Sequence, residues 1–264
     1  MNTARNAHDD SGTLLAVSSL TKRFGGLVAL HDVSFSTITH RVTSIVGPNG
    51  AGKTTLFNLI SGVIRPDEGK VVFNGADVSG WQPHQLAGAG LARTFQNVQL
   101  FPNLNALENV MVGRVCRTSS SVLDTLLMLP GERRERRARA ERAEEMLELV
   151  GIADKRLSFP KELPYGDQKR LEIARALATE PKLLILDEPT QGMVAREANG
   201  IVKLMGDLTA RNLTILLIEH NMNVVMSASD KVIVLNFGEK IAEGTPAQVR
   251  ADPHVIEAYL GAEA

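Results

Sequence analysis

Residues 47–55 read GPNGAGKTT, and this short stretch constrains the fold more than any other part of the chain. It satisfies the pattern G-x-x-x-x-G-K-[ST]. The apolar run VTSIV (42–46) predicts a strand before it, and KTTLFNLIS (53–61) predicts a helix after it. Glycines let successive backbone N–H groups point at phosphate oxygens, and the helix start adds positive charge. The sequence therefore predicts a phosphate-binding loop, the alternative being a glycine-rich turn with a surface lysine.

Two side chains of this phosphate loop have expected roles of their own. Lys53 is expected to reach the β- and γ-phosphates of a nucleotide, and the Thr54 hydroxyl is expected to bind Mg²⁺. The residues expected to bind the nucleotide here are Gly47, Pro48, Asn49, Gly50, Ala51, Gly52, Lys53, Thr54 and Thr55.

An acidic pair ends a second apolar run, LLILDEP (183–189). In a parallel α/β sheet, ligands bind outside the carboxyl ends of the strands, so Asp187 and Glu188 are expected beside the phosphate loop. Asp187 is placed to hold Mg²⁺, directly or through water, and Glu188 to act as general base on the attacking water. Without the phosphate loop, the same pair would also fit a solvated turn.

The order of apolar runs predicts the fold class. Short apolar runs between glycine- and aspartate-bearing turns make residues 14–80 rich in predicted strands. The expected strands and helices then alternate, at 168–179 (helix), 183–187 (strand), 195–211 (helix), 214–218 (strand) and 232–235 (strand). The late strands are near-continuous apolar runs, which suits parallel strands buried on both faces. This alternation predicts an α/β domain with a mostly parallel sheet.

Residues 97–162 have a different character, because the strand signal fades there. In ERRERRARAERAEEMLELV (132–150), one helical stripe collects the apolar side chains of Ala143, Met146, Leu147 and Val150. Arg and Glu fill the other face, which we interpret as solvated rather than as a nucleic-acid patch. Residues 1–12 are polar and are expected to form a flexible tail, with residues 13–264 as a single domain.

Composition excludes some partners. The 29 Lys and Arg residues are balanced by 30 Asp and Glu residues, so the formal charge of the 264-residue chain is −1. A protein that binds nucleic acid usually has an excess of basic residues, so no nucleic-acid partner is expected for this chain. No apolar run in the chain approaches the length of ~20 residues that is needed to span a bilayer. Any work at a membrane is therefore expected to go through a partner.

The stretch LPYGDQKRLEIARAL (163–177), upstream of the acidic pair, resembles the signature of ABC transporter ATP-binding subunits. Gln96 in RTFQNVQLF (93–101) is similar to their Q-loop glutamine, and His220 in LLIEHNM to their switch histidine. Phe24 in KRFGGLVAL matches their adenine-stacking aromatic residue, with simple core packing as the alternative. The resemblance covers residues 13–263.

This resemblance implies a P-loop NTPase (RecA-like) fold, with an N-terminal antiparallel β subdomain and a helical subdomain inserted at about 97–162. It implies ATP and Mg²⁺ as ligands, with Glu188, His220 and Gln96 as catalytic residues. The implied metal ligands are Thr54, Gln96 and Asp187. The signature, which acts on the ATP of a second ATPase subunit, consists of Leu163, Pro164, Tyr165, Gly166, Asp167 and Gln168. The helix after it is expected to begin near Asp167.

Several motifs are similar to one subfamily, the importers of branched-chain amino acids, with urea and amide importers as the alternative. The implied partners are a second ATPase subunit, two transmembrane permease subunits and, indirectly, an extracytoplasmic solute-binding protein. The implied location is the cytoplasmic face of the plasma membrane. A soluble ABC ATPase for DNA repair or translation and an exporter ATPase are further alternatives.

Two positions depart from the family pattern. Pro164 stands where the signature usually has serine, and it offers neither a hydroxyl nor an N–H group. Val194, in the D-loop TQGMVA (190–195), stands where an Asp or Asn is usual. In the family, both positions belong to segments that act on the ATP bound by the opposite subunit. We therefore expect a heterodimer in which this subunit hydrolyses its own ATP well and serves its partner's ATP weakly, with a nucleotide-bound scaffold as the alternative.

Overall fold

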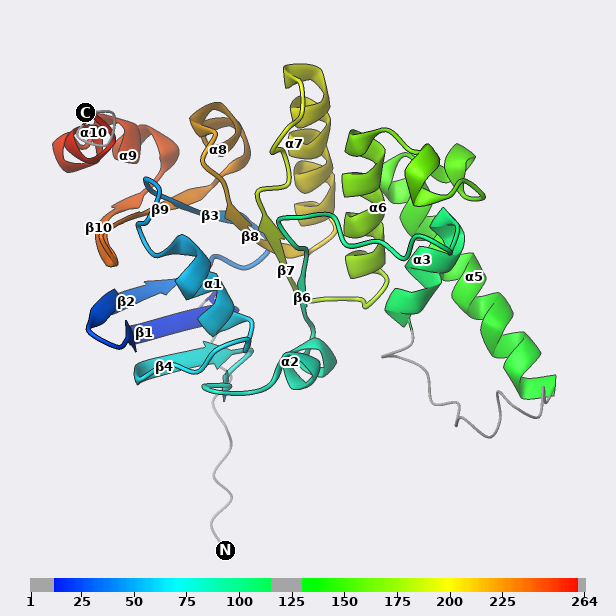
Figure 1. The fold of residues 1–264 in the computed structure, drawn as a ribbon, viewed down its shortest axis with the longest axis horizontal. Helices are drawn as coiled ribbons and strands as arrows, with labels where there is room; N and C mark the ends of the chain where they lie inside the picture. The colour runs from blue at the N-terminus through cyan, green and yellow to red at the C-terminus, as the bar shows by residue number, and fades with distance from the viewer. Residues whose placement is uncertain (1–11, 115–129, 261–264) are drawn as a thin grey trace, which may run out of the picture.

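The computed structural model (Figure 1) describes residues 12–114 and 130–260. Of the predicted N-terminal tail, residues 1–11 lie outside the described part. Two sheets and the helices around them form the fold. No helix in the two described ranges has both the length and the hydropathy needed to cross a bilayer.

The central sheet has six strands in the order β10-β9-β3-β8-β7-β6. Its strands are β3 (Val42–Val46), β6 (Leu91–Arg93), β7 (Leu183–Asp187), β8 (Thr214–Ile218), β9 (Lys231–Asn236) and β10 (Glu239–Gly244). Five of them are parallel, and only β10 runs antiparallel, beside β9. Every residue of β3, β7 and β8 is buried. The predicted mostly parallel sheet is confirmed, and the carboxyl ends of its parallel strands share one edge.

A second, antiparallel sheet is built from the N-terminal strands, in the order β2-β1-β4-β5. They are β1 (Leu15–Phe24), β2 (Leu27–Ser36), β4 (Glu68–Phe73) and β5 (Ala76–Asp77). Helix α1 (Lys53–Ile60) lies between this sheet and the central one (Figure 1). Leu56 and Phe57 of α1 are fully buried in a core shared by both sheets. The helix after the phosphate loop is thereby fixed on two sides.

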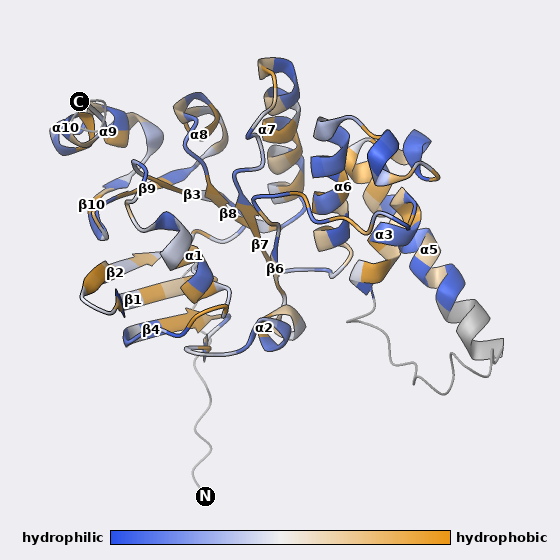
Figure 2. Ribbon diagram, in the orientation of Figure 1, coloured by the Kyte–Doolittle hydropathy of each residue, from blue (hydrophilic) through white to orange (hydrophobic). Residues whose placement is uncertain are grey.

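Alternate residues of β7 face two different cores. Leu183 and Ile185 pack in the core around α1, whereas Leu184 and Leu186 pack in the core on the opposite face. The second core includes α6 (Tyr165–Leu177) and α7 (Ala195–Thr209). Figure 2 shows the central strands as the most apolar part of the ribbon. Burial on both faces explains the continuous apolar runs in the sequence.

The helical part contains α3 (Ala106–Gly113), α5 (Pro130–Val150) and the short helices η2 (Ala153–Lys155) and η3 (Pro160–Glu162), all within the range expected for it. Ala143, Leu147 and Val150 of α5 are fully buried, so the predicted apolar stripe is confirmed. Helix α6 packs with α3 and α5 and begins at Tyr165, two residues before the predicted start near Asp167.

The C-terminal segment folds as α8 (Met222–Ala228), α9 (Pro246–Ala251) and α10 (Pro253–Leu260). Thr245 caps α9, since its backbone N–H donates to Gln248 Oε1 over 2.8 Å and its hydroxyl accepts from the Gln248 N–H. Thr245 and Gln248 thus form a capping box at the start of α9. Helix α2 (Pro83–Ala89) was not predicted from the sequence.

Candidate nucleotide site

The phosphate loop runs tightly between β3 and α1, and two of its glycines have no room for a side chain. A Cβ at Gly47 would lie 2.2 Å from the Leu235 carbonyl oxygen, and one at Gly52 would lie 2.7 Å from that of Ala29. The backbone N–H of Gly238 donates to the Ala51 carbonyl over 3.1 Å. The glycines are therefore required by the close approach of three backbone segments.

Lys53 lies in the mouth of this loop and is only 8% exposed. Its Nζ donates to the carbonyl oxygens of Gly47 over 2.7 Å and Pro48 over 2.8 Å. Burial lowers the pKa of Lys53, and the nearby Glu188 carboxylate opposes that shift. Thr54 is exposed in the first turn of α1, and Thr55 is half-buried. The ammonium group is thus held by the carbonyl oxygens of the phosphate loop itself.

The acidic pair lies at the end of β7, as predicted. Asp187 is the last residue of the strand, and its Oδ2 lies 3.6 Å from Nη2 of Arg93. Burial raises the pKa of Asp187, and Arg93 partly offsets this. Glu188 adopts φ = 45°, a left-handed conformation that is strained for a residue with a side chain. Glu188 therefore occupies a strained turn directly after β7.

The three predicted catalytic residues come together from three neighbouring strands. Gln96 Nε2 donates to Glu188 Oε2 over 3.1 Å, and His220 Nδ1 lies 3.4 Å from Glu188 Oε1. Gln96 follows β6, Glu188 follows β7 and His220 follows β8, so the shared sheet edge brings them into contact. Glu188 therefore has a side-chain partner at each of its carboxylate oxygens.

Two charged side chains at this edge were not predicted from the sequence. Arg93 is stacked on Phe57, with its guanidinium carbon 3.9 Å from the ring centroid, and it donates to Asn58 Oδ1 over 2.9 Å and to Ser61 Oγ over 2.8 Å. It thereby joins α1 to the Asp187 carboxylate. Its place just before the Q-loop glutamine was the only sequence signal.

The other unpredicted residue is Glu219, which is fully buried directly after β8. Its Oε1 accepts from the hydroxyl of Thr190 over 2.5 Å, and its Oε2 accepts from the backbone N–H of His220 over 3.2 Å. This carboxylate fixes the switch-histidine segment to the start of the D-loop. In the sequence it directly follows the predicted apolar strand at 214–218.

The signature residues lie at the start of α6, away from α1 in Figure 1. Pro164 caps the helix, and Tyr165 is 42% exposed. A Cβ at Gly192 of the D-loop would lie 3.5 Å from the Tyr165 ring, and one at Gly166 would lie 3.2 Å from Glu197 of α7. The signature and the D-loop are thus neighbours on one surface.

The other signature residues make contacts within this chain. Leu163 is buried, and its carbonyl oxygen accepts from Gln168 Nε2. Asp167 forms an ion pair with Lys155.

Two apolar side chains of interest are exposed. Phe24 at the end of β1 is 49% exposed, so it is not a core residue, and Lys22 Nζ lies 5.5 Å from its ring centroid. Gly25 and Gly26 leave open space beside it. Val194 of the D-loop is 65% exposed. The ring of Phe24 is thus exposed near the N-terminal sheet, and the apolar side chain of Val194 is exposed near the signature.

Comparison with known proteins agrees with this geometry. The family model described as "ABC transporter" matches residues 30–191. The chain belongs to the ABC transporter ATP-binding family. A second model, for the branched-chain amino acid ATP-binding cassette transporter, matches residues 239–264. As an ABC ATPase, the chain is an ATP-binding, ATP-hydrolysing transport component, which confirms the predicted family and enzyme class.

Similar ABC proteins cover nearly the whole chain. It is 42% identical to the high-affinity branched-chain amino acid transport ATP-binding protein BraF of Pseudomonas aeruginosa, and 40% identical to LivG of Escherichia coli K12, which bears the same description. Each alignment covers 95% of this chain and 99% of the relative. The crystal structure of a nucleotide-free ATP-binding cassette matches with a TM-score of 0.82 and 35% identity, over 94% of this chain and 98% of that one. The predicted fold class is confirmed.

Proposed function

We propose that this chain is the ATP-hydrolysing subunit of an importer for branched-chain amino acids. The observation that carries the catalytic part is the contact of Gln96 and His220 with the two oxygens of Glu188, at the sheet edge that the phosphate loop shares. The solute is supported by the match over residues 239–264 and by the names of BraF and LivG. A related urea or amide importer is the second candidate.

The hydrolysis step follows from this placement. Water attacks the γ-phosphorus in line, the bond from that phosphorus to the β-phosphate oxygen breaks, and ADP leaves. Glu188 accepts the proton of the attacking water. Lys53 and the N–H groups of the phosphate loop stabilise the charge on the phosphate oxygens. His220 and Gln96 hold the carboxylate so that it faces the water.

The residues expected to bind Mg²⁺ have suitable chemistry. Thr54 offers a hydroxyl and Asp187 a carboxylate, and Gln96 donates through Nε2, which leaves its amide oxygen for a metal. Within the described residues, no cluster of three or more His, Cys, Asp or Glu side chains could hold a metal. A site with few protein carboxylates suits Mg²⁺, which takes its other oxygens from water and from phosphates. When bound, it neutralises charge on the β- and γ-phosphates.

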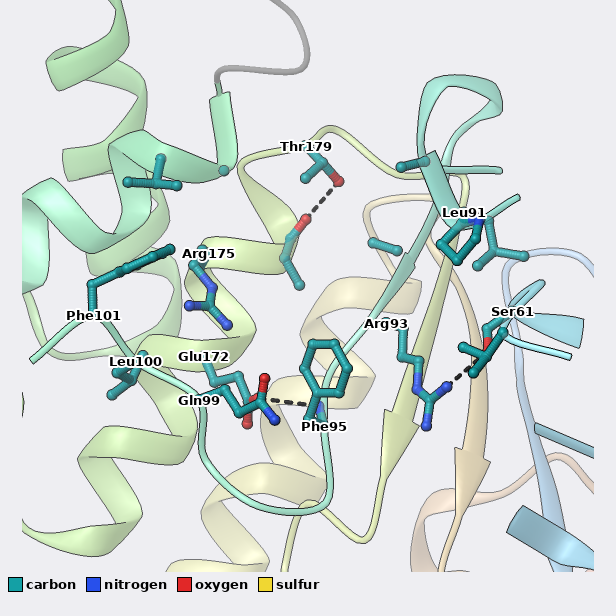
Figure 3. Close-up of a pocket in the computed structure, with 17 residues that line it drawn as sticks. Ser61, Leu91, Arg93, Phe95, Gln99, Leu100, Phe101, Glu172, Arg175 and Thr179 are labelled. Atoms are coloured by element: carbon teal, nitrogen blue, oxygen red, sulfur yellow. Dashed lines mark hydrogen bonds between the residues drawn. The ribbon is translucent and has the colours of Figure 1, made fainter. Parts of the chain in front are cut away.

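A groove beside the Q-loop gives the permease a place to bind. It has a volume of about 740 Å³ and lies between the central sheet and the helical part (Figure 3). Phe95, Leu100 and Phe101 give it an apolar wall, and Arg175 gives it a cation. A short helix from a transmembrane subunit fits such a groove. We place the chain at the cytoplasmic face of the membrane, with two permease subunits and, outside, a solute-binding protein.

The signature surface supports a second ATPase subunit as partner. Tyr165 and Val194 are exposed there, and a cassette solved as a dimer resembles this chain with a TM-score of 0.75 and 27% identity. Pro164 and Val194 replace the residues usual in the family at this surface. We propose a heterodimer in which this chain hydrolyses ATP at its own phosphate loop and serves the partner's ATP weakly.

Reconstitution tests this function. The chain, its permeases and the second ATPase are reconstituted in vesicles with ATP enclosed and the binding protein outside, and ATP-driven accumulation of leucine, isoleucine, valine, urea and acetamide in the vesicles is compared. Uptake of the branched-chain amino acids supports the proposal, and uptake of urea or acetamide alone favours the second candidate. Replacing the general base of each ATPase subunit separately tests the heterodimer, because turnover that is unaffected by Glu188→Gln would contradict it.

A further inference from the structure

Lys169 is a buried lysine in the signature helix that the mechanism above does not use. It lies on α6 and is only 2% exposed. Its Nζ donates to the Gln96 carbonyl oxygen over 2.6 Å and to the Phe95 carbonyl oxygen over 3.3 Å. A side chain of α6 is thus attached to the backbone of the very residue whose side chain contacts Glu188.

Glu172, one turn later on α6, holds the same segment from a second direction. It is also 2% exposed, and its Oε1 accepts from the Phe95 backbone N–H over 3.0 Å (Figure 3). Its Oε2 lies 3.9 Å from Lys169 Nζ. Lys169 and Glu172, which we call the Q-loop clamp, together bind both polar backbone groups of Phe95 and the carbonyl of Gln96.

A buried ion pair is in general a weak source of stability. Burial lowers the pKa of Lys169 and raises that of Glu172, so the charged form of each is disfavoured where it lies. Replacing a buried ion pair with neutral side chains of similar volume often leaves a protein as stable or makes it more stable. What the charges add is a fixed geometry between α6 and the Q-loop.

The clamp lies between the two functional surfaces of the chain. Tyr165 of the signature is one helical turn before Lys169, whose Nζ lies 6.0 Å from the Tyr165 ring centroid. On the other side, Gln96 donates to Glu188. A shift of the signature helix therefore moves the backbone of Gln96, and with it the amide that holds the general base.

We propose that Lys169 is a positioning residue that carries movement of the signature helix to Gln96 and, through Gln96, to Glu188. This inference rests on the proposed function, in which the signature binds the ATP of the second subunit. Binding at the partner's phosphate loop then sets the general base at this chain's own site. Lys169 touches neither ATP nor water in this role.

A double-mutant cycle separates this role from a merely structural one. The reconstituted transporter is made with Lys169→Met, Gln96→Ala and both, and kcat and KM for ATP are measured. Lys169→Met is expected to lower kcat roughly tenfold, as for one lost hydrogen bond to a charged group, with little change in KM. In the Gln96→Ala background the same substitution is expected to change kcat by less than about twofold. Fluorescent-nucleotide affinity is expected to stay unchanged.

Other outcomes would overturn the proposal. Equal losses of kcat in both backgrounds, or no loss in either, would show that Lys169 does not act through Gln96. If Lys169→Met does not fold, the same cycle with Lys169→Met/Glu172→Gln decides, because that pair removes both buried charges. Lys203→Met, at an exposed lysine of α7, is the matched control. Failure of the unsubstituted transporter to hydrolyse ATP would instead contradict the proposed function.

Discussion

Gln96 Nε2 lies 3.1 Å from Glu188 Oε2, and this contact joins the residue after β6 to the residue after β7. His220 occupies the other oxygen at 3.4 Å. Glu188 is also held at φ = 45°. Strained backbone of this kind persists where its surroundings fix it, and it is common at active sites. The general base therefore has its direction set by the turn and by two neighbours.

Removing the Lys53 ammonium is expected to weaken nucleotide binding. In Lys53→Ala the phosphates lose at least one hydrogen bond to a charged group, which corresponds to roughly a tenfold to hundredfold rise in Kd. Titration with a fluorescent ATP analogue measures this. The unfolding temperature serves as a control for folding, and an unchanged Kd would contradict the role of Lys53.

Two glycines of the phosphate loop are expected to differ in their tolerance of alanine. A Cβ at Gly47 would overlap the Leu235 carbonyl oxygen at 2.2 Å, whereas a Cβ at Gly50 meets nothing within 4 Å. Gly50→Ala is expected to cost about 1–2 kcal/mol for its left-handed backbone. Gly47→Ala is expected to cost about 3 kcal/mol or more. Urea unfolding without nucleotide compares them, and equal losses would contradict the observed packing.

The pair formed by Lys22 and Asp67 is expected to make stability depend on pH. The hydrogen bond from Lys22 and that from the backbone N–H of Arg23 lower the pKa of Asp67. The folded protein thus binds this proton more weakly than the unfolded chain does. The stabilisation is therefore complete above the unfolded pKa and is lost as the pH falls through the folded one.

Asp67→Asn is expected to lower the unfolding temperature at pH 7 by a small amount. The difference from the unsubstituted protein should shrink as the medium is acidified through the normal aspartate range. Thermal unfolding followed by circular dichroism across pH gives both curves. A difference that grows in acid would contradict the assigned direction.

The Glu219 carboxylate offers a test of how the switch histidine is held. Glu219→Gln places an amide where two backbone N–H groups, those of His220 and Asn221, now donate. One oxygen acceptor is lost, so kcat is expected to fall roughly tenfold while nucleotide Kd changes little. Phosphate release and nucleotide titration check the two parts. A change confined to Kd would show that Glu219 acts elsewhere.

The parts of the fold that were predicted from the sequence are those with a strong local pattern. β7 and β8 lie at the predicted residues 183–187 and 214–218, because burial on both faces leaves a continuous apolar run. β6 has only three residues, and β10, EKIAEG, is mostly polar at the edge of the sheet, so neither carries such a run. α2 has only seven residues, about two turns, which is too short for a periodic signal.

In the site, too, the residues that belong to a recognisable motif were predicted and those placed by packing alone were not. Gln96, Glu188 and His220 were identified through motifs, and the structure brings them together. Lys169 and Glu172 were missed because a charged helix predicts solvent-facing side chains, and only the packing of α6 on the Q-loop buries them. Arg93 was likewise missed because the sequence does not show that α1 packs against it.

Single-turnover phosphate release by the reconstituted transporter, with and without Glu188→Gln, tests the central claim most directly. With glutamine at 188 the side chain keeps its size and loses the ability to accept a proton. We predict that ATP binds with similar affinity, that the ATPase dimer accumulates in its nucleotide-bound form, and that phosphate release falls at least about a hundredfold. Phosphate release at the unsubstituted rate would contradict the account, because the water would then be activated by another group.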